Sequence, residues 1–442
     1  MTNTDHMVNG FDMATLGSLE PELRSLVSRR AALLGPAYKL FYEHPVQFVR
    51  ASGVHLYDAE GREYLDAYNN VPSVGHCHPH VVEAVSKQIA TLNTHTRYAY
   101  EPLLDYAERL LSTFPAAISN VMFTCSGSEA VDLAVRVARF YTRGTGVIVT
   151  NNAYHGTTTA AAELSPSLGS GVALGRDVWA IDLPLAKLAV GSDVGHELAS
   201  SVRSAIADME RHGVTFAAFI ADSLLSSDGI FPHPKGFLGP IAKAVRDAGG
   251  LYIADEVQPG FARTGEAMWG FERHGVEPDL AVLGKPMGNG MPIAAIVARP
   301  ELLEEFGAVS RYFNTFGGNS VSIAAANAVL DVINDEGLLE NSRLVGEKLR
   351  TTVEEIAAER EDIVAVRGVG LYVAADVVSP RDGEPDADLA SRIVNQLRER
   401  RVLISAVGRA GNTLKIRPPL TFSRDHVAQF GEALDDVVSA IR

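Results

Sequence analysis

Residues 280–290 read LAVLGKPMGNG: a short apolar run, a glycine-rich turn and one lysine, Lys285. Consecutive apolar residues are typical of a buried strand, and glycines let the chain turn sharply after it. A lysine at the end of such a strand projects into a cleft, where burial lowers the pKa of its amine. Because a neutral amine attacks carbonyl groups, Lys285 is the first candidate catalytic residue. Taken alone, a surface lysine in a loop gives the same pattern.

Similar apolar runs recur between about residue 80 and residue 325, separated by segments with helical periodicity. They are residues 147–150, 216–221, 251–254 and 293–298. Buried runs spaced by helices predict an α/β fold with a mostly parallel sheet that is covered on both faces. Ligands bind at the carboxyl ends of the strands in such sheets, so polar residues directly after these runs are candidate site residues.

The two ends of the chain have other patterns. Residues 18–50 show helical periodicity with a break at Gly35 and Pro36, and alternation about Gly61 predicts an antiparallel hairpin. After residue 325, helical segments surround short strand-like runs, which indicates a smaller α+β domain. We therefore divide the chain into an N-terminal segment (1–70) that joins the small domain, a large domain (71–325) and a C-terminal small domain (326–442).

The composition excludes several functions. The 442 residues include 39 basic and 54 acidic side chains, for a net charge of −15. Such a protein repels nucleic acids and anionic membranes, although a local pocket can still be positive. No run reaches the ~20 apolar residues of a membrane helix, and residues 1–17 do not resemble a signal peptide. Cys77 and Cys125 indicate neither a disulfide framework nor a metal site. We expect a cytoplasmic protein with a small-molecule partner and no metal.

Two polar residues follow predicted strands. Asp255 comes directly after the run at 251–254, where a carboxylate would keep the pyridine nitrogen of a cofactor protonated. Tyr154, in the motif AYHG, follows the run at 147–150, and its ring would stack on a flat ring. A helix N-cap and a packed loop aromatic, respectively, are the alternatives.

Two further motifs contain donors for a phosphate. Residues 123–130, FTCSGSEA, combine a strand end, a small-residue turn and a helix start, where free N–H groups and the helix dipole favour an anion. Ser126 and Ser128 add hydroxyl donors there, and Thr315, in YFNTFGGN at 312–319, adds another. Serine also caps helices without any ligand, and the second motif also fits a simple turn.

Together the motifs resemble the class III aminotransferases, fold type I enzymes that use pyridoxal 5′-phosphate. GHCHP at 75–79, SGSEA, AYHG, ADEVQ, GKP and NTFGGN occur in the order found in that family, and the resemblance runs from about residue 35 to the C-terminus. It implies a large domain on a seven-stranded, mostly parallel sheet, a smaller α+β domain, and a homodimer whose active sites lie at the subunit interface.

The resemblance also implies roles for the candidate residues. Lys285 would carry the cofactor aldehyde and later move protons, Asp255 would pair with the pyridine nitrogen, and Gln258 would approach the ring oxygen. The other candidate cofactor-binding residues are Ser126, Gly127 and Ser128 at the phosphate, Tyr154 on the ring face, His155, Asp222, and Thr315 from the neighbouring subunit. His76 and His78 belong to a turn motif that is structural in the family, so no metal is assigned.

Two positions depart from the typical family pattern. Asp222 and Ser223 stand where many members have Glu-Pro. Lys415 stands three residues before Pro418, where the family has an arginine that grips a substrate carboxylate, and Arg417 should lie on the same strand face. Lysine is a point charge rather than a bidentate clamp, which argues against a 2-amino acid as the natural substrate.

Other segments resemble one branch of the family, the ethanolamine-phosphate and phosphohydroxylysine phospho-lyases. These segments are residues 65–71, 75–79, 93–98, 284–290, 401–405 and 414–419. The branch implies elimination of phosphate from O-phosphoethanolamine or a related phosphorylated amine, giving acetaldehyde, ammonia and phosphate. We nominate Asn70, Arg97, Lys415 and Arg417 as substrate-binding residues. The alternative is an aminotransferase that acts on an ω-amine or a 2-amino acid with a keto-acid acceptor.

Overall fold

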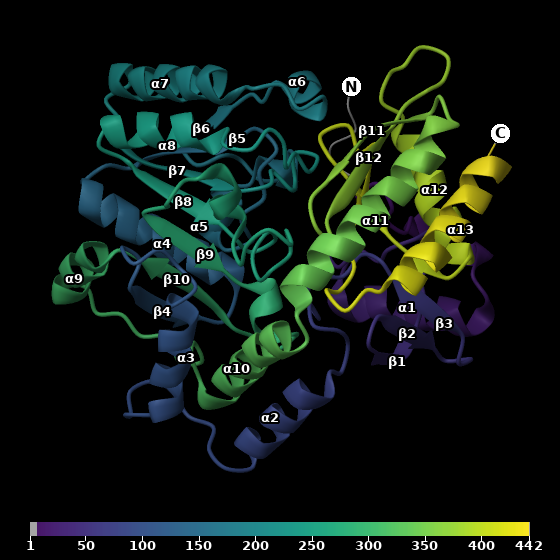
Figure 1. Ribbon diagram of the computed structural model, residues 1–442, viewed down its shortest axis with the longest axis horizontal. Helices are drawn as coiled ribbons and strands as arrows, with labels where there is room; N and C mark the ends of the chain where they lie inside the picture. The colour runs from purple at the N-terminus through teal and green to yellow at the C-terminus, as the bar shows by residue number, and fades with distance from the viewer. Residues whose placement is uncertain (1–6, 442) are drawn as a thin grey trace.

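The computed structural model of this chain describes residues 7–441, whose helices and strands form two lobes side by side (Figure 1). Residues 1–6 and residue 442, which belong to the predicted N-terminal segment and small domain, lie outside the described residues.

A seven-stranded sheet forms the centre of the larger lobe, in the order β4-β10-β9-β8-β7-β5-β6. Its strands are β4 (Asn120–Thr124), β5 (Gly146–Thr150), β6 (Val178–Ile181), β7 (Phe216–Asp222), β8 (Leu251–Asp255), β9 (Leu280–Leu283) and β10 (Ala294–Ala298). Strands β5 to β9 run parallel, whereas β10 is antiparallel to both of its neighbours. The predicted fold class and the mostly parallel sheet are confirmed.

Two features of this sheet were not predicted. β6 is an edge strand in which Val178 and Trp179 are half-buried and Ala180 is exposed, so it lacks the fully buried pattern of the central strands. The direction of β10 also differs from that of the other predicted runs, because strand direction depends on the connection and not on the residues of the strand.

Helices cover both faces of this sheet, as predicted. Ile253 belongs to the core that contains α4 and α9, whereas its neighbours Tyr252 and Ala254 belong to the core that contains α7 and α8. Successive strand residues point to opposite faces, so β8 contributes to both cores. The helices of this lobe are α3 (Glu101–Leu111), α4 (Gly127–Thr142), α5 (Thr159–Glu163), α6 (Leu185–Ala189), α7 (Gly195–Arg211), α8 (Leu238–Asp247) and α9 (Pro300–Val309), with the short turns η2 (Pro166–Leu168), η3 (Gly270–His274) and η4 (Lys285–Gly288).

The N-terminal segment is helical only in part. After η1 (Met13–Ser18), helix α1 spans Pro21–Leu34, but the predicted helix over residues 35–50 is wrong. Gly35, at φ 72°, ends the helix, and Pro36 has no N–H with which to continue it. The chain instead turns and reaches strand β1 (Phe48–Ser52).

A four-stranded sheet joins the two ends of the chain, in the order β1-β2-β3-β13. β2 (His55–Asp58) and β3 (Glu63–Asp66) are antiparallel, which confirms the predicted hairpin. β13 (Val402–Leu403) pairs parallel with β3, so the N-terminal segment contacts the C-terminal part. The division of the chain at residues 70 and 325 stays a prediction.

A second four-stranded sheet completes the smaller lobe, in the order β11-β12-β15-β14. Its strands are β11 (Ile363–Gly368), β12 (Val373–Val377), β14 (Ser405–Val407) and β15 (Thr413–Ile416), and its helices are α11 (Leu338–Ala358), α12 (Ala387–Glu399) and α13 (Arg424–Ala440). α2 (Pro79–Ile89) packs against α10 (Ser320–Asp335), below both lobes in Figure 1. Within residues 7–441, no helix is long and apolar enough to cross a membrane.

Candidate active site

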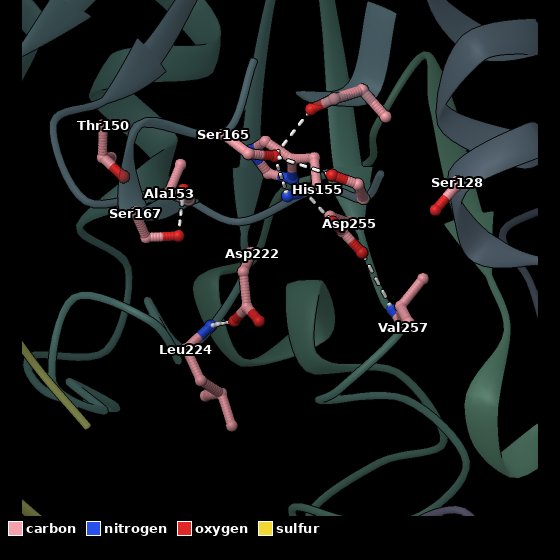
Figure 2. A network of polar contacts seen from close by, with 12 residues as sticks. Ser128, Thr150, Ala153, His155, Ser165, Ser167, Asp222, Leu224, Asp255 and Val257 are labelled. Atoms are coloured by element: carbon pink, nitrogen blue, oxygen red, sulfur yellow. Dashed lines mark hydrogen bonds and ion pairs between the residues drawn. The ribbon is translucent and has the colours of Figure 1, made fainter. Parts of the chain in front are cut away.

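Three adjacent parallel strands end at one edge of the large sheet and bring three ionisable residues together. Asp222 ends β7 and Asp255 ends β8, in register with each other, and Lys285 follows β9 after Gly284 (Figure 2 shows both carboxylates). A ligand site was predicted at the carboxyl ends of these strands, and three of the candidate residues lie there.

The amine of Lys285 has an unusual environment. Lys285 is the first residue of η4 and has a φ of 32°. Its side chain lines a cavity. Burial and then the positive charge of Arg417 lower the pKa of Lys285 to about 8, against the opposing pull of Asp255 and Asp222. A considerable fraction of the amine is therefore neutral near physiological pH, as a nucleophile requires.

Asp255 is held by two groups. Its Oδ2 lies 2.6 Å from Nδ1 of the buried His155, and its Oδ1 accepts a hydrogen bond of 3.1 Å from the N–H of Val257 (Figure 2). Nε2 of His155 is buried without a hydrogen-bond partner among residues 7–441. His155 was predicted as a cofactor-binding residue; in the structure its ring contacts the Asp255 carboxylate and helps to orient it.

Asp222 is the second carboxylate at this edge. It accepts a hydrogen bond of 2.8 Å from the N–H of Leu224. Burial and then the nearby charge of Asp255 raise the pKa of Asp222 to about 6. Above that pH Asp222 is charged, and its charge, like that of Asp255, favours the charged form of Lys285.

A cavity of about 200 Å³ lies between Asp255, Lys285 and the start of α4. It is lined by Gly127, Ser128, Tyr154, His155, Gly156, Asp255, Val257, Gln258 and Lys285. An added Cβ at Gly156 would lie 2.4 Å from Oγ of Ser128, so only glycine fits at this wall. Most of the residues predicted to bind the cofactor thus surround one cavity.

The N-terminus of α4 forms the anion-binding side of this cavity. The hydroxyl of Ser126 accepts a hydrogen bond from the N–H of Glu129, and Glu129 in turn accepts from the N–H of Ser126. Ser126 is therefore a helix N-cap, the alternative that the motif left open, and its contact with a phosphate stays a prediction. Gly127 and Ser128 begin the helix, where N–H groups have no intrahelical partner.

These features fit pyridoxal 5′-phosphate. A partly neutral lysine, a buried carboxylate and a helix N-terminus line one cavity, and the half-exposed ring of Tyr154 lies at its wall. The buried, unpartnered Nε2 of His155 marks a polar position behind the carboxylate. Each chemical part of the cofactor, namely its aldehyde, ring, ring nitrogen and phosphate, has a complementary group here.

Lys415 and Arg417 lie together, as their spacing predicted. Both are buried, and both donate to Oε1 of Gln258, Lys415 Nζ over 3.0 Å and Arg417 through Nη1. No carboxylate oxygen lies within 4.0 Å of either cation among residues 7–441. Burial and then the charge of Arg417 lower the pKa of Lys415. The two cations form a positive site beside Lys285.

Three predicted site residues lie elsewhere in the chain. Asn70 is buried, with both side-chain amide atoms unpartnered among the described residues, and it is not a lining residue of the cavity. Arg97 and Thr315 are exposed, and the guanidinium of Arg97 lies 3.7 Å from the ring centroid of Phe313. Their roles toward substrate and cofactor stay predictions.

Two residues at the site were not predicted. The hydroxyl of Tyr372 donates to Gln258 over 3.3 Å, and Asp228 accepts a hydrogen bond of 2.9 Å from Thr150. Burial raises the pKa of Asp228 to about 7. Asp228 follows β7 by six residues, so a wider window after that strand would have included it, whereas nothing in the sequence around Tyr372 indicates its position.

Comparison with known proteins gives consistent results. The family model described as aminotransferase class-III matches residues 40–438. The chain is 39% identical to "Ethanolamine-phosphate phospho-lyase homolog 1" of Caenorhabditis elegans, over 94% of this chain and 93% of that protein. It is 39% identical to "Alanine--glyoxylate aminotransferase 2-like" of Drosophila melanogaster, over 92% of this chain and 85% of that protein.

Solved structures also match. A phospholyase from Arthrobacter in complex with phosphoethanolamine is 42% identical, with a TM-score of 0.90 over 94% of this chain and all of that chain. An aminotransferase from Bacillus anthracis, 24% identical with a TM-score of 0.86 over 95% of this chain and 99% of that one, shows the same fold.

The charges around Lys285 give a first prediction. Asp222 favours the charged amine, so Asp222→Asn should lower the pKa of Lys285 below about 8. The rate at which the cofactor-free protein captures pyridoxal phosphate covalently should therefore reach its plateau at a lower pH. Each half unit of pKa raises the neutral fraction at pH 7 about threefold. Asp228→Asn is the matched control: it removes a buried carboxyl that acts on Asp222 but not directly on Lys285, so it should shift the profile less. An unchanged or upward-shifted profile in Asp222→Asn would contradict this assignment.

Proposed function

The chain belongs to the aminotransferase class III family, and on that premise we propose that it is a phospho-lyase acting on O-phosphoethanolamine or a related phosphorylated amine. Its cofactor is pyridoxal 5′-phosphate. A relative named as a phospho-lyase homolog and a phospholyase structure with bound phosphoethanolamine, each similar over 94% of this chain, support this proposal.

The buried pair Lys415 and Arg417 is the observation that carries the proposal. Two cations share one neutral acceptor, Gln258, and no carboxylate oxygen of residues 7–441 lies within 4.0 Å of either, although the charge of Asp222 acts on Lys415. Burying unpaired charge costs several kcal/mol, which an anionic ligand at this site would offset. Arg417 is close enough to Lys285 to lower the pKa of its amine. One small molecule could therefore place its amine at Lys285 and its anionic group at Lys415 and Arg417.

The residues of the cavity take distinct roles in this proposal. Lys285 would hold the cofactor covalently, and Asp255, which contacts His155, would pair with the ring nitrogen. Tyr154 would cover the ring, Gln258 would bind the ring oxygen, and Ser126, Gly127 and Ser128 would receive the phosphate at the start of α4. Bound pyridoxal phosphate supplies an electron sink for the charge left when a proton leaves the carbon next to nitrogen.

The elimination itself needs a base and a site for the leaving group. Lys285, once its amine is free, removes the proton from the carbon that bears the substrate nitrogen. The electron pair of that C–H bond forms the new C=C bond, and the C–O bond to phosphate breaks. Lys415 and Arg417 stabilise the charge of the departing phosphate. The released enamine takes up one water and yields acetaldehyde and ammonia, so no keto acid is consumed.

An aminotransferase is the second candidate. The relative named as an alanine–glyoxylate aminotransferase 2-like protein is as similar, at 39% identity, as the phospho-lyase homolog. In such an enzyme the same cations would hold a carboxylate, and a keto acid would have to accept the amino group. The need for an acceptor separates the two candidates.

We also propose that the enzyme is a homodimer in which Thr315 reaches the cofactor phosphate of the neighbouring subunit. Thr315 is exposed, and so are the aromatic side chains near it: Phe316 at 69%, Tyr98 at 65% and Phe313 at 39%. His95 stacks on Tyr98 and contacts Phe313, so these three rings form a continuous group, and Phe316 follows Phe313 by three residues. Exposed apolar surface of this kind is typical of an interface.

The lyase proposal predicts that purified protein releases inorganic phosphate and acetaldehyde in equal amounts from O-phosphoethanolamine without a keto acid. The two products are measured by colorimetric phosphate and coupled alcohol-dehydrogenase assays. Ethanolamine without phosphate is the matched control and should yield no acetaldehyde. Absence of phosphate release, together with amino transfer to pyruvate, would instead establish the aminotransferase.

The dimer proposal predicts a particle of about twice the 47.3 kDa chain mass in light scattering after gel filtration. Phe316→Asp places a charge on the apolar surface and should yield monomers with little activity. Val190→Asp alters another strongly exposed apolar residue, directly after α6, and should remain dimeric and active. A wild-type monomer with full activity would exclude a shared active site.

A further inference from the structure

Gln258 connects the cation pair with the cofactor cavity. It lies in the loop after β8 and lines the cavity with Lys285 and Asp255. Its Oε1 accepts hydrogen bonds from Lys415, Arg417 and the hydroxyl of Tyr372, three residues of the smaller lobe. One amide oxygen is thus the shared acceptor of two buried positive charges and a phenol.

These donors fix the orientation of the amide. Ammonium and guanidinium groups donate and cannot accept, so the side of Gln258 that faces them is the oxygen. Its Nε2 makes no hydrogen bond to any residue from 7 to 441. Because Gln258 lines the cavity and its oxygen is engaged, Nε2 is the polar atom that it offers to the contents of the cavity.

The cations keep donors for an anion while they hold Gln258. Lysine has three N–H donors and arginine five. Oε1 of Gln258 takes one donor from each, and the carbonyl of Tyr68 lies 3.4 Å from Nε of Arg417. An anion at Lys415 and Arg417 therefore need not displace Gln258. The anion, the two cations and the Gln258 amide would form one hydrogen-bonded series that ends at the cavity.

The charge at one end of such a series affects the hydrogen bond at its other end. Positive donors on an amide oxygen polarise the amide and strengthen its N–H as a donor at the other end. An anion that neutralises Lys415 and Arg417 weakens this polarisation. The strength of the Nε2 hydrogen bond inside the cavity therefore depends on whether the anion site is filled.

We propose that Gln258 is a positioning residue that reports occupation of the anion site by Lys415 and Arg417 to the cofactor through its Nε2 donor. This inference rests on the proposed function, since it assumes a bound cofactor and a substrate whose phosphate reaches these cations. It assigns Gln258 a role in specificity: an amine that lacks the anionic group fails to change the cofactor's hydrogen bonding.

The experiment uses the cofactor-loaded protein and inorganic phosphate as the probe. The cofactor absorption band reports hydrogen bonding in the cavity, and the shift in melting temperature reports phosphate binding. In the wild type, phosphate should stabilise the protein and shift the band at the same concentrations. Gln258→Met keeps the length of the side chain but removes both polar atoms; it should bind phosphate at least as tightly as the wild type, with loss of the band shift.

Two control variants complete the test. Tyr372→Phe removes one donor to Gln258 but leaves the cations, and should keep the band shift. Lys415→Met should lose both phosphate binding and the band shift. The inference is overturned if phosphate stabilises the wild type without moving the band, if Gln258→Met retains the wild-type shift, or if phosphate does not bind. Since no turnover is measured, a protein that fails to release phosphate from O-phosphoethanolamine can still show the coupled response.

Discussion

The burial of opposite charges at one sheet edge is the constraint on which the site depends. Asp222, Asp255 and Lys285 stand at the ends of three neighbouring parallel strands, and β15 and the residues just beyond it add Lys415 and Arg417 from the other lobe. In a poorly solvated region, each of these charges sets the protonation of the others. The sheet positions Asp222, Asp255 and Lys285. The smaller lobe, packed against this edge, adds the two positive charges.

The site separates two buried lysines by their partners. Lys285 has the carboxylates of Asp255 and Asp222 nearby, which keep its pKa at about 8, within reach of proton transfer at neutral pH. Lys415 makes its hydrogen bond to a neutral amide and lies beside a second cation, and of the two carboxylates only Asp222 acts on its charge. An amine next to carboxylates is suited to exchange protons, whereas an amine next to Arg417 is suited to an anion. Lysine thus serves two chemical roles at this site, and only the residues around each lysine distinguish them.

Sequence predicted the parts of this structure that local patterns determine. The central strands, the turn at Lys285 and the strand-turn-helix at Ser126 are confirmed because apolar runs, glycines and capping residues act within a few positions. The direction of β10, the non-helical path of the chain after the predicted break at Gly35 and the hydroxyl of Tyr372 were missed. The position of Tyr372 depends on packing between lobes, more than a hundred residues away from Gln258 along the chain, and no local pattern records such a contact.

We propose that Lys285, and not the buried Lys415, is the amine that binds the cofactor. Borohydride treatment of the cofactor-loaded protein makes the carbon–nitrogen bond permanent, and peptide mapping by mass spectrometry then locates the label. We predict one label per chain, on Lys285. A label on Lys415, or on no lysine of the site, would contradict it.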